Sequence, residues 1–199
     1  MEKKIREPKQ ERSIDKKNKI IETAYEVFSD VGYYNTNTAD IAKRAGVSTG
    51  IVYGYFKDKR DILLYVTKIY MDKVSLPLAE FMKNIKLPLD FSAEVKKIVD
   101  LVIKIHKSNA NLHNTLHSLA VTDESVYREF LHLEERITID ASKHLGEFGF
   151  TTLHLKEKVH IAMNLIQSFA HEYVYDKHPY INYTEMKRSV IKMIVALFE

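Results

Sequence analysis

One short segment of the sequence combines hydroxyl, aromatic and glycine residues at helical spacing. A helix is expected over residues 48–56, with Val52 and Phe56 turned toward a core. The residues that remain outside the core are Thr49, Gly50, Ile51 and Tyr53. A threonine or tyrosine hydroxyl can bond a base edge, an aromatic ring can pack on a thymine methyl, and glycine permits close backbone approach. This combination is typical of a helix that enters the major groove of duplex DNA.

Further polar side chains flank this helix at positions suited to phosphate contacts. Thr38, Tyr55 and Lys59 can each donate a hydrogen bond to a phosphate oxygen. Lys59 also lies close to the start of the next expected helix, where the helix dipole attracts anions. We therefore predict that these three residues position the recognition face without reading base sequence.

Such a face needs two short helices that cross closely, and the preceding residues provide them. A first helix is expected over residues 15–31 and a second over 38–45, where Asn37 and Asp40 form a weak capping-box pattern. Small residues at the crossing and a glycine turn follow, namely Ala42, Ala45 and Gly46. Asp58 predicts the start of a longer helix that reaches about Lys83. Helices are also expected over 90–107, 109–119, 123–146, 152–176 and 183–198.

At this point the sequence resembles the DNA-binding head of TetR-type transcriptional regulators. The resemblance runs from Ile20 through Leu63 and rests on an ordered series of motifs: Phe28, Gly32-Tyr33, Thr36 to Thr38, Ile41-Ala42, Ala45-Gly46-Val47-Ser48, Tyr53-Gly54-Tyr55-Phe56 and Lys59. It implies DNA contacts at Thr38, Thr49, Tyr53, Tyr55 and Lys59. Ala39 and Gly54 depart from the family pattern, because longer side chains are usual at both positions.

The resemblance implies an all-α fold with a three-helix head and a larger antiparallel helical bundle for ligand binding and dimerisation. The domains expected are a basic arm over 1–14, a helix-turn-helix domain over 15–60 and a bundle over 61–199. A frayed tail is the alternative for the arm. The resemblance also implies a homodimer formed by the last two helices, through Met163, Ile166, Ala170, Tyr173, Val190, Ile194 and Leu197. A stripe that packs inside the chain is the alternative.

A ligand pocket is expected inside the bundle. Its candidate lining is apolar and aromatic: Tyr65, Ile69, Tyr70, Phe81, Ile105, Leu116, Phe130, Leu133 and Phe169. Such a lining favours a small apolar or amphipathic effector, although ordinary core is the better interpretation of each residue taken singly. His113 and His117 have the i, i+4 spacing of metal ligands, but solvated or core histidines are the better interpretation, so we expect no metal or cofactor.

Composition is consistent with this interpretation. Residues 1–60 hold 13 Lys and Arg against 9 Asp and Glu, and residues 61–199 hold 17 against 18, so the positive excess lies at the N-terminal end. The chain has no cysteine, which excludes disulfides and thiolate metal sites. No long apolar stretch or signal peptide is evident, so we expect a cytoplasmic protein without membrane contact.

The sequence thus predicts a ligand-responsive DNA-binding regulator. We expect a repressor that a small effector releases from a palindromic operator on double-stranded DNA. The alternative is a ligand-independent, nucleoid-associated DNA-binding protein that uses the same head. No nucleophile elbow or glycine-rich phosphate loop is present, so an enzyme is not expected.

Overall fold

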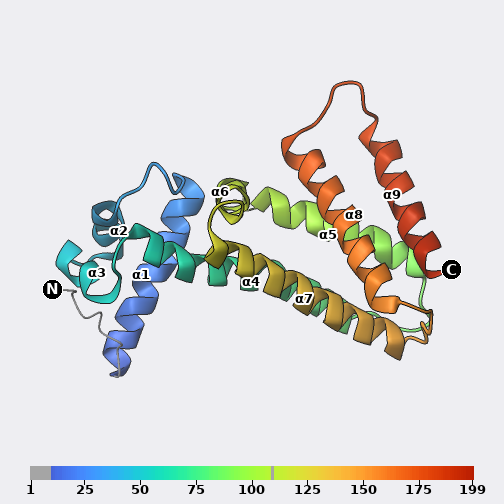
Figure 1. Ribbon diagram of the computed structural model, residues 1–199, viewed down its shortest axis with the longest axis horizontal. Coiled ribbons are helices and arrows are strands. Elements are labelled where there is room, and N and C mark those ends of the chain that lie inside the picture. Colours follow the sequence, from blue (N-terminus) through green and yellow to red (C-terminus); the bar gives the residue numbers. More distant parts are fainter. Residues whose placement is uncertain (1–9, 109) are drawn as a thin grey trace. The chain divides into compact units, whose positions relative to one another are not determined.

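The computed structural model describes residues 10–108 and 110–199. Within these residues the chain forms nine α-helices and no strand, which confirms the predicted all-α fold. Figure 1 labels the helices, which are α1 (Glu11–Asp30), α2 (Thr38–Ala45), α3 (Thr49–Tyr55), α4 (Lys59–Lys83), α5 (Phe91–Ser108), α6 (Ala110–Ala120), α7 (Glu124–Glu147), α8 (Leu155–Tyr175) and α9 (Tyr183–Phe198).

Local capping signals place most helix boundaries where the sequence predicts them. α2 has the predicted bounds because Asn37 caps its start and Gly46, at φ 71°, ends it in the left-handed region. α4 begins after Asp58, whose Oδ1 accepts a hydrogen bond of 2.8 Å from the backbone N–H of Asp61.

The start of α1 is the main difference from the expected boundaries. α1 begins at Glu11 rather than near Asp15, and Gln10 is its N-cap. No glycine or proline interrupts residues 10–14, and Glu11 places a negative charge in the first turn, where the helix dipole favours it. Residues 1–9 of the expected basic arm lie outside the described residues, and residues 11–14 belong to α1.

The described chain divides into two compact units, each with its own core. The first contains the residues up to Asp72 and those from Ala110 to Phe130. Its core includes Phe28, Ile41, Val52 and Phe56, each at most 1% exposed, as the sequence predicts. α6 packs on α1 in this unit, where the Asn111 side-chain amide donates a 2.8 Å hydrogen bond to the carbonyl of Ser29.

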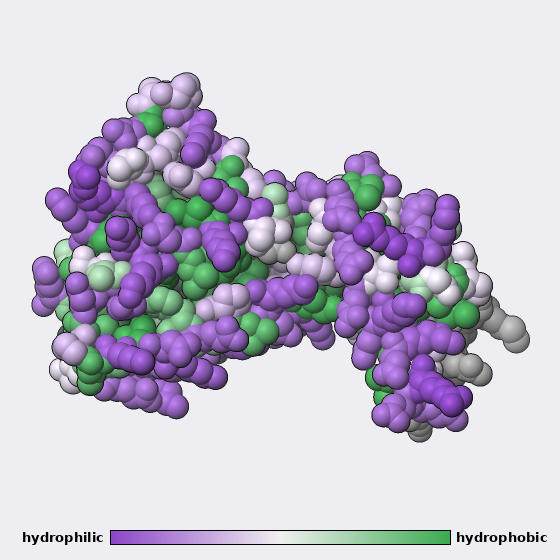
Figure 2. Space-filling view, turned by 180° about the vertical axis from the view of Figure 1, so that it is seen from behind, coloured by the Kyte–Doolittle hydropathy of each residue, from purple (hydrophilic) through white to green (hydrophobic). Residues whose placement is uncertain are grey.

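The second unit contains Lys73–Ser108 and Leu131–Glu199. α5, α8 and α9 pack against one another in it. Their shared core includes Val99, Ile166, Phe169, Ala170 and Ile194. On the face drawn in Figure 2, hydrophobic residues gather mainly over this unit, whereas the rest of the face is mostly hydrophilic.

α4 contributes residues to both units and contains Pro77. A proline in a helix has no N–H to donate to the carbonyl four residues earlier, here that of Lys73.

No described helix combines the length and apolar character needed to cross a membrane.

Candidate nucleic-acid interface

The start of α2 is fixed by a reciprocal pair of hydrogen bonds. The Asn37 Oδ1 accepts from the backbone N–H groups of Ala39 at 2.9 Å and Asp40 at 3.0 Å. The Asp40 Oδ2 accepts in return from the backbone N–H of Asn37 at 3.1 Å. This is the predicted capping box, and it satisfies N–H groups that a helix start otherwise leaves unpaired.

The turn between α2 and α3 is tight and lined with small residues. Ala42 and Ala45 are each 1% exposed, and the backbone N–H of Val47 donates a 3.0 Å hydrogen bond to the carbonyl of Ala42. Gly46 takes the positive φ that the turn requires. Ser48 stands at the N-cap of α3 with extended backbone, but its side chain makes no capping hydrogen bond.

One face of α3 is anchored in the core and the other is open. Val52 is fully buried, whereas Gly50 is exposed and Tyr53 is 41% exposed. Thr49 and Ile51 are partly exposed. Each of the four residues expected to read bases is therefore at least partly accessible.

A hydrogen bond connects the first residue of α2 to this surface. The hydroxyls of Thr38 and Tyr53 lie 2.9 Å apart, and either can donate to the other. The accepting hydroxyl keeps its own proton, so the pair retains an O–H for a phosphate oxygen. The bond also fixes the Tyr53 side chain, which would otherwise have to be ordered on binding.

The other two predicted phosphate contacts are engaged within the protein. The Tyr55 hydroxyl lies 2.8 Å from the Ser13 Oγ of α1. The Lys59 Nζ donates to the carbonyls of Tyr33 and Thr36, at 2.8 Å each. Burial in this loop lowers the pKa of the Lys59 ammonium. Lys59 thus holds the loop between α1 and α2 in place, and its Nζ also lies 4.2 Å from the centroid of the Tyr33 ring.

An ion pair that sequence patterns did not indicate links the start of α4 to the turn before α7. The Arg60 Nε lies 2.7 Å from the Asp123 Oδ2, and a second guanidinium nitrogen lies 2.8 Å from Oδ1. This bidentate contact raises the pKa of Arg60 and lowers the pKa of the Asp123 carboxyl. It ties two segments of the first unit that are distant in sequence.

The residues expected to line a ligand pocket do not all belong to one compact unit. Tyr65, Ile69, Tyr70, Leu116 and Phe130 lie in the first unit, and Phe81, Ile105, Leu133 and Phe169 lie in the second. Leu116 and Phe169 are core residues of their units. Tyr65 accepts a 2.9 Å hydrogen bond from the Lys17 ammonium.

A buried polar pair lies among these candidates. The Tyr70 hydroxyl is 2.7 Å from the Nδ1 of His113, and both residues are at most 4% exposed. The ring of His117 lies 4.2 Å from that of His113 and 4.5 Å from that of Phe130, centroid to centroid. Among the described residues no group of three or more potential metal ligands occurs. The two histidine rings lie in one cluster with Phe130.

The stripe expected to pair with a second copy packs largely inside the chain. Met163, Ile166 and Ala170 of α8 and Val190 and Ile194 of α9 are each at most 9% exposed. Tyr173 and Leu197 are partly buried against the same core. A hydrophobic stripe at helical spacing shows that one face of a helix is buried, but not which element covers that face. Here α5 covers much of this face of α8 and α9.

Two short helices joined by a glycine turn, with the second helix exposed, define a helix-turn-helix protein. Comparison with known proteins shows which family this N-terminal segment is similar to. Residues 20–66 match the model of the N-terminal domain described as "Bacterial regulatory proteins, tetR family". Residues 20–66 are thus similar to the N-terminal domain of this family, as the sequence motifs suggested.

Individual relatives agree with this assignment. The chain is 34% identical over 119 residues to the fatty acid metabolism regulator protein of Bacillus subtilis, a match covering 59% of this chain and 56% of the relative. It is 36% identical over 76 residues to the HTH-type transcriptional regulator HbdR of Aromatoleum, covering 38% and 33%. The chain thus spans between a third and just over half of the length of these relatives.

The likeness in fold extends over nearly the whole chain. A tetR-family transcriptional regulator from Streptomyces coelicolor superposes with a TM-score of 0.71 at 17% identity, covering 92% of this chain and 80% of that one. The helices that follow the head therefore share the TetR-type architecture, although the sequences have diverged.

Proposed function

We propose that this protein is a transcriptional regulator that binds a DNA operator through α3. The observation that carries the proposal is the open face of a rigidly held helix, with Gly50 exposed and Tyr53 fixed by Thr38. The N-terminal end of α3 would enter the major groove, where Thr49 and Tyr53 would meet base edges. Thr38, Tyr55 and Lys59 would hold the flanking phosphates.

The regulator would act as a homodimer in the cytoplasm. One such head reads few base pairs, whereas two heads about 34–36 Å apart read a palindrome across one helical turn. α8 and α9 keep apolar residues outside their core, because Ile161 is 47% exposed and Met193 is 49% exposed. We assign the contact with a second copy to this outer surface of α8 and α9, beside the stripe that packs within the chain.

A small apolar or amphipathic effector would control the affinity for DNA. The relative named for fatty acid metabolism supports an effector of this chemical character. An effector can release the operator only if it binds one arrangement of the dimer more tightly than the other, which typically amounts to about 1–3 kcal/mol. We propose repression relieved in this way.

Selection of bound sequences from random duplex DNA tests the proposal. Enrichment of a palindrome is expected, with an affinity that falls steeply as salt is raised. Tyr53→Phe should weaken binding to the selected duplex, and Tyr180→Phe is a matched control because that tyrosine is exposed in the loop between α8 and α9. A selection without any enriched sequence would refute the DNA-binding function.

Titration of the selected complex with fatty acids and other amphipathic metabolites tests the regulatory part. Release of the duplex by one class of compound is expected. An operator affinity that no such compound changes would instead favour the ligand-independent DNA-binding protein.

A further inference from the structure

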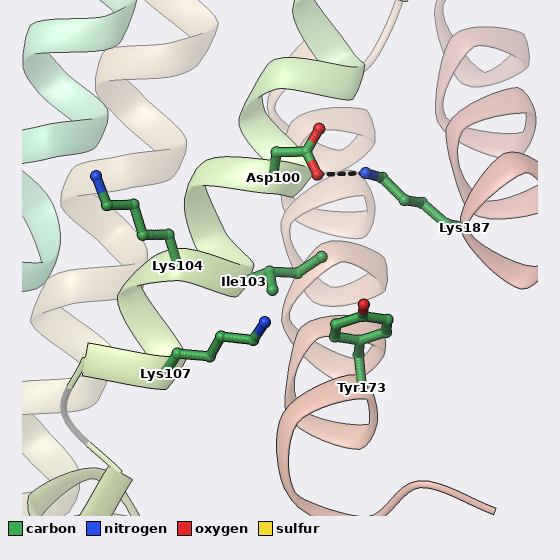
Figure 3. A pocket seen from close by; sticks show the side chains of 6 residues that line it. All are labelled: Asp100, Ile103, Lys104, Lys107, Tyr173 and Lys187. Carbon is green, nitrogen blue, oxygen red and sulfur yellow. Dashed lines mark hydrogen bonds and ion pairs between the residues drawn. The ribbon is translucent and has the colours of Figure 1, made fainter. Parts of the chain in front are cut away.

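A groove rich in lysine lies across α5, α8 and α9 in the second unit. Its volume is about 310 Å³, and its lining consists of Asp100, Ile103, Lys104, Lys107, Tyr173 and Lys187. Figure 3 shows the Lys107 ammonium directed toward Tyr173, while Lys187 reaches Asp100 across the groove. None of the contacts proposed for DNA uses these residues.

Positive charge dominates this lining. Three lysines and one carboxylate line the groove, and that carboxylate is paired with Lys187. In Figure 3 the Lys104 side chain extends away from Tyr173 and Lys187. Lys104 has the i, i+4 spacing from Asp100 that favours an ion pair on a helix, yet Asp100 bonds α9 instead. Lys104 and Lys107 make no ion pair with a carboxylate among the described residues, and like charges three positions apart repel. An anion in the groove would remove that repulsion.

The floor of the groove is an aromatic ring with an aliphatic neighbour. The Lys107 Nζ lies 5.5 Å from the centroid of the Tyr173 ring, and the Lys177 Nζ lies 3.9 Å from it. Ile103 adds an apolar surface beside the ring. The groove therefore offers a flat contact for an organic group and cations at its edge for charged groups.

The kind of cation indicates the kind of anion. No arginine lines the groove, so the planar fork that matches a carboxylate is missing from it. Lysine ammonium groups act as point charges, which suit the several oxygens of a phosphate. The volume lies at the lower end of the roughly 300–1,000 Å³ range of small-molecule sites.

We propose that the groove formed by Lys104, Lys107, Lys187 and Tyr173 binds a small phosphate-bearing organic molecule, with the lysines on the phosphate and Tyr173 against the organic group. Its residues are distinct from those proposed to contact DNA and from those expected to line the apolar effector pocket, although Tyr173 packs against Phe169 of that expected lining. It would give the protein a second ligand of different chemistry.

Calorimetric titration of the full-length protein with adenosine diphosphate and with pyrophosphate, in the absence of DNA, tests the proposal. Saturable binding of both is expected, with tighter binding of the nucleotide because its base can contact Tyr173. The Lys104→Gln/Lys107→Gln variant should weaken binding at least tenfold, a ratio that corresponds to about 1.4 kcal/mol. The control is Lys96→Gln/Lys97→Gln, which removes two charges from the same helix outside the groove and should bind as the wild type does.

Several outcomes would overturn the proposal. They are an absence of saturable binding at millimolar ligand, equal losses in the two double variants, and unchanged binding in the groove variant with a normal helical circular dichroism spectrum. A groove variant that loses affinity for duplex DNA but binds no small phosphate would show that the lysines serve DNA instead. Because the readout is ligand binding without DNA, failure here leaves the proposed operator binding untouched.

Discussion

Replacing Gly50 with alanine separates the stability of α3 from its approach to DNA. A Cβ built at Gly50 would meet only the Ser48 Oγ, at 3.9 Å, which is an ordinary van der Waals distance. Alanine has a higher helix propensity than glycine, by up to about 1 kcal/mol. The variant should therefore be at least as stable as the wild type, with Tm higher by about 2–4 °C if the full amount is realised in a chain of this size.

The same methyl group should impair DNA binding. Gly50 lies at the N-terminal end of the exposed face, the end that a recognition helix inserts first. A methyl group between backbone and bases would separate α3 from the base edges, where a good contact contributes about 1–3 kcal/mol. We expect affinity for the selected operator to fall by roughly tenfold or more, at about 1.4 kcal/mol per tenfold.

Fluorescence anisotropy with the operator duplex and thermal unfolding of the free protein give the two readouts. Gly146→Ala is the matched control, because Gly146 is exposed in α7 and nothing lies within 4 Å of an added Cβ. That variant should gain stability without losing affinity. A Gly50→Ala protein that is stable and still binds the operator as tightly as the wild type would refute close approach of the α3 backbone to DNA.

Three further predictions concern the rest of the chain. Tyr70→Phe removes a hydroxyl that bonds His113 in a buried site, and should lower the free energy of unfolding in a denaturant titration by about 1–3 kcal/mol; no loss would show that the pair does not stabilise the fold. Arg60 lowers the pKa of Asp123, so the stability from this pair is present above the ordinary carboxyl pKa near 4 and is lost as pH falls through the lowered value. Wild-type Tm should therefore exceed that of Arg60→Gln at neutral pH, and the two should converge in acid; a constant difference across pH would contradict this. Ile161→Asp should shift sedimentation from dimer to monomer at micromolar concentration, whereas a variant that remains dimeric would place the interface elsewhere.

Local chemistry explains why the head could be predicted well from the sequence. A capping box depends on residues three positions apart, and a glycine turn on a single residue, so Asn37, Asp40 and Gly46 fix the bounds of α2 by themselves. The hydrophobic stripe that includes Phe28 can only pack into the core of so short a domain, and Phe28 is indeed buried there. These signals do not depend on how the rest of the chain folds.

Contacts between distant segments could not be predicted in the same way. Arg60 and Asp123 are separated by 63 residues, and Tyr70 and His113 by 43, so no pattern in the sequence relates them. The stripe of α8 and α9 shows the same limit, because its periodicity identifies a buried face but not the surface against it. The lysine groove likewise needs three helices to be brought together before it exists.

The first compact unit is formed by two stretches of chain, the residues up to Asp72 and residues 110–130. A protease cut or a stop codon after Asp72 would therefore release a fragment without α6, and the surface of α1 that α6 covers would be bare. Fusing the head to another regulator meets the same difficulty, since the recipient must supply an equivalent of α6 or the graft must include it. The compact unit that contains the proposed DNA-binding helix is thus formed by two separate segments of the sequence.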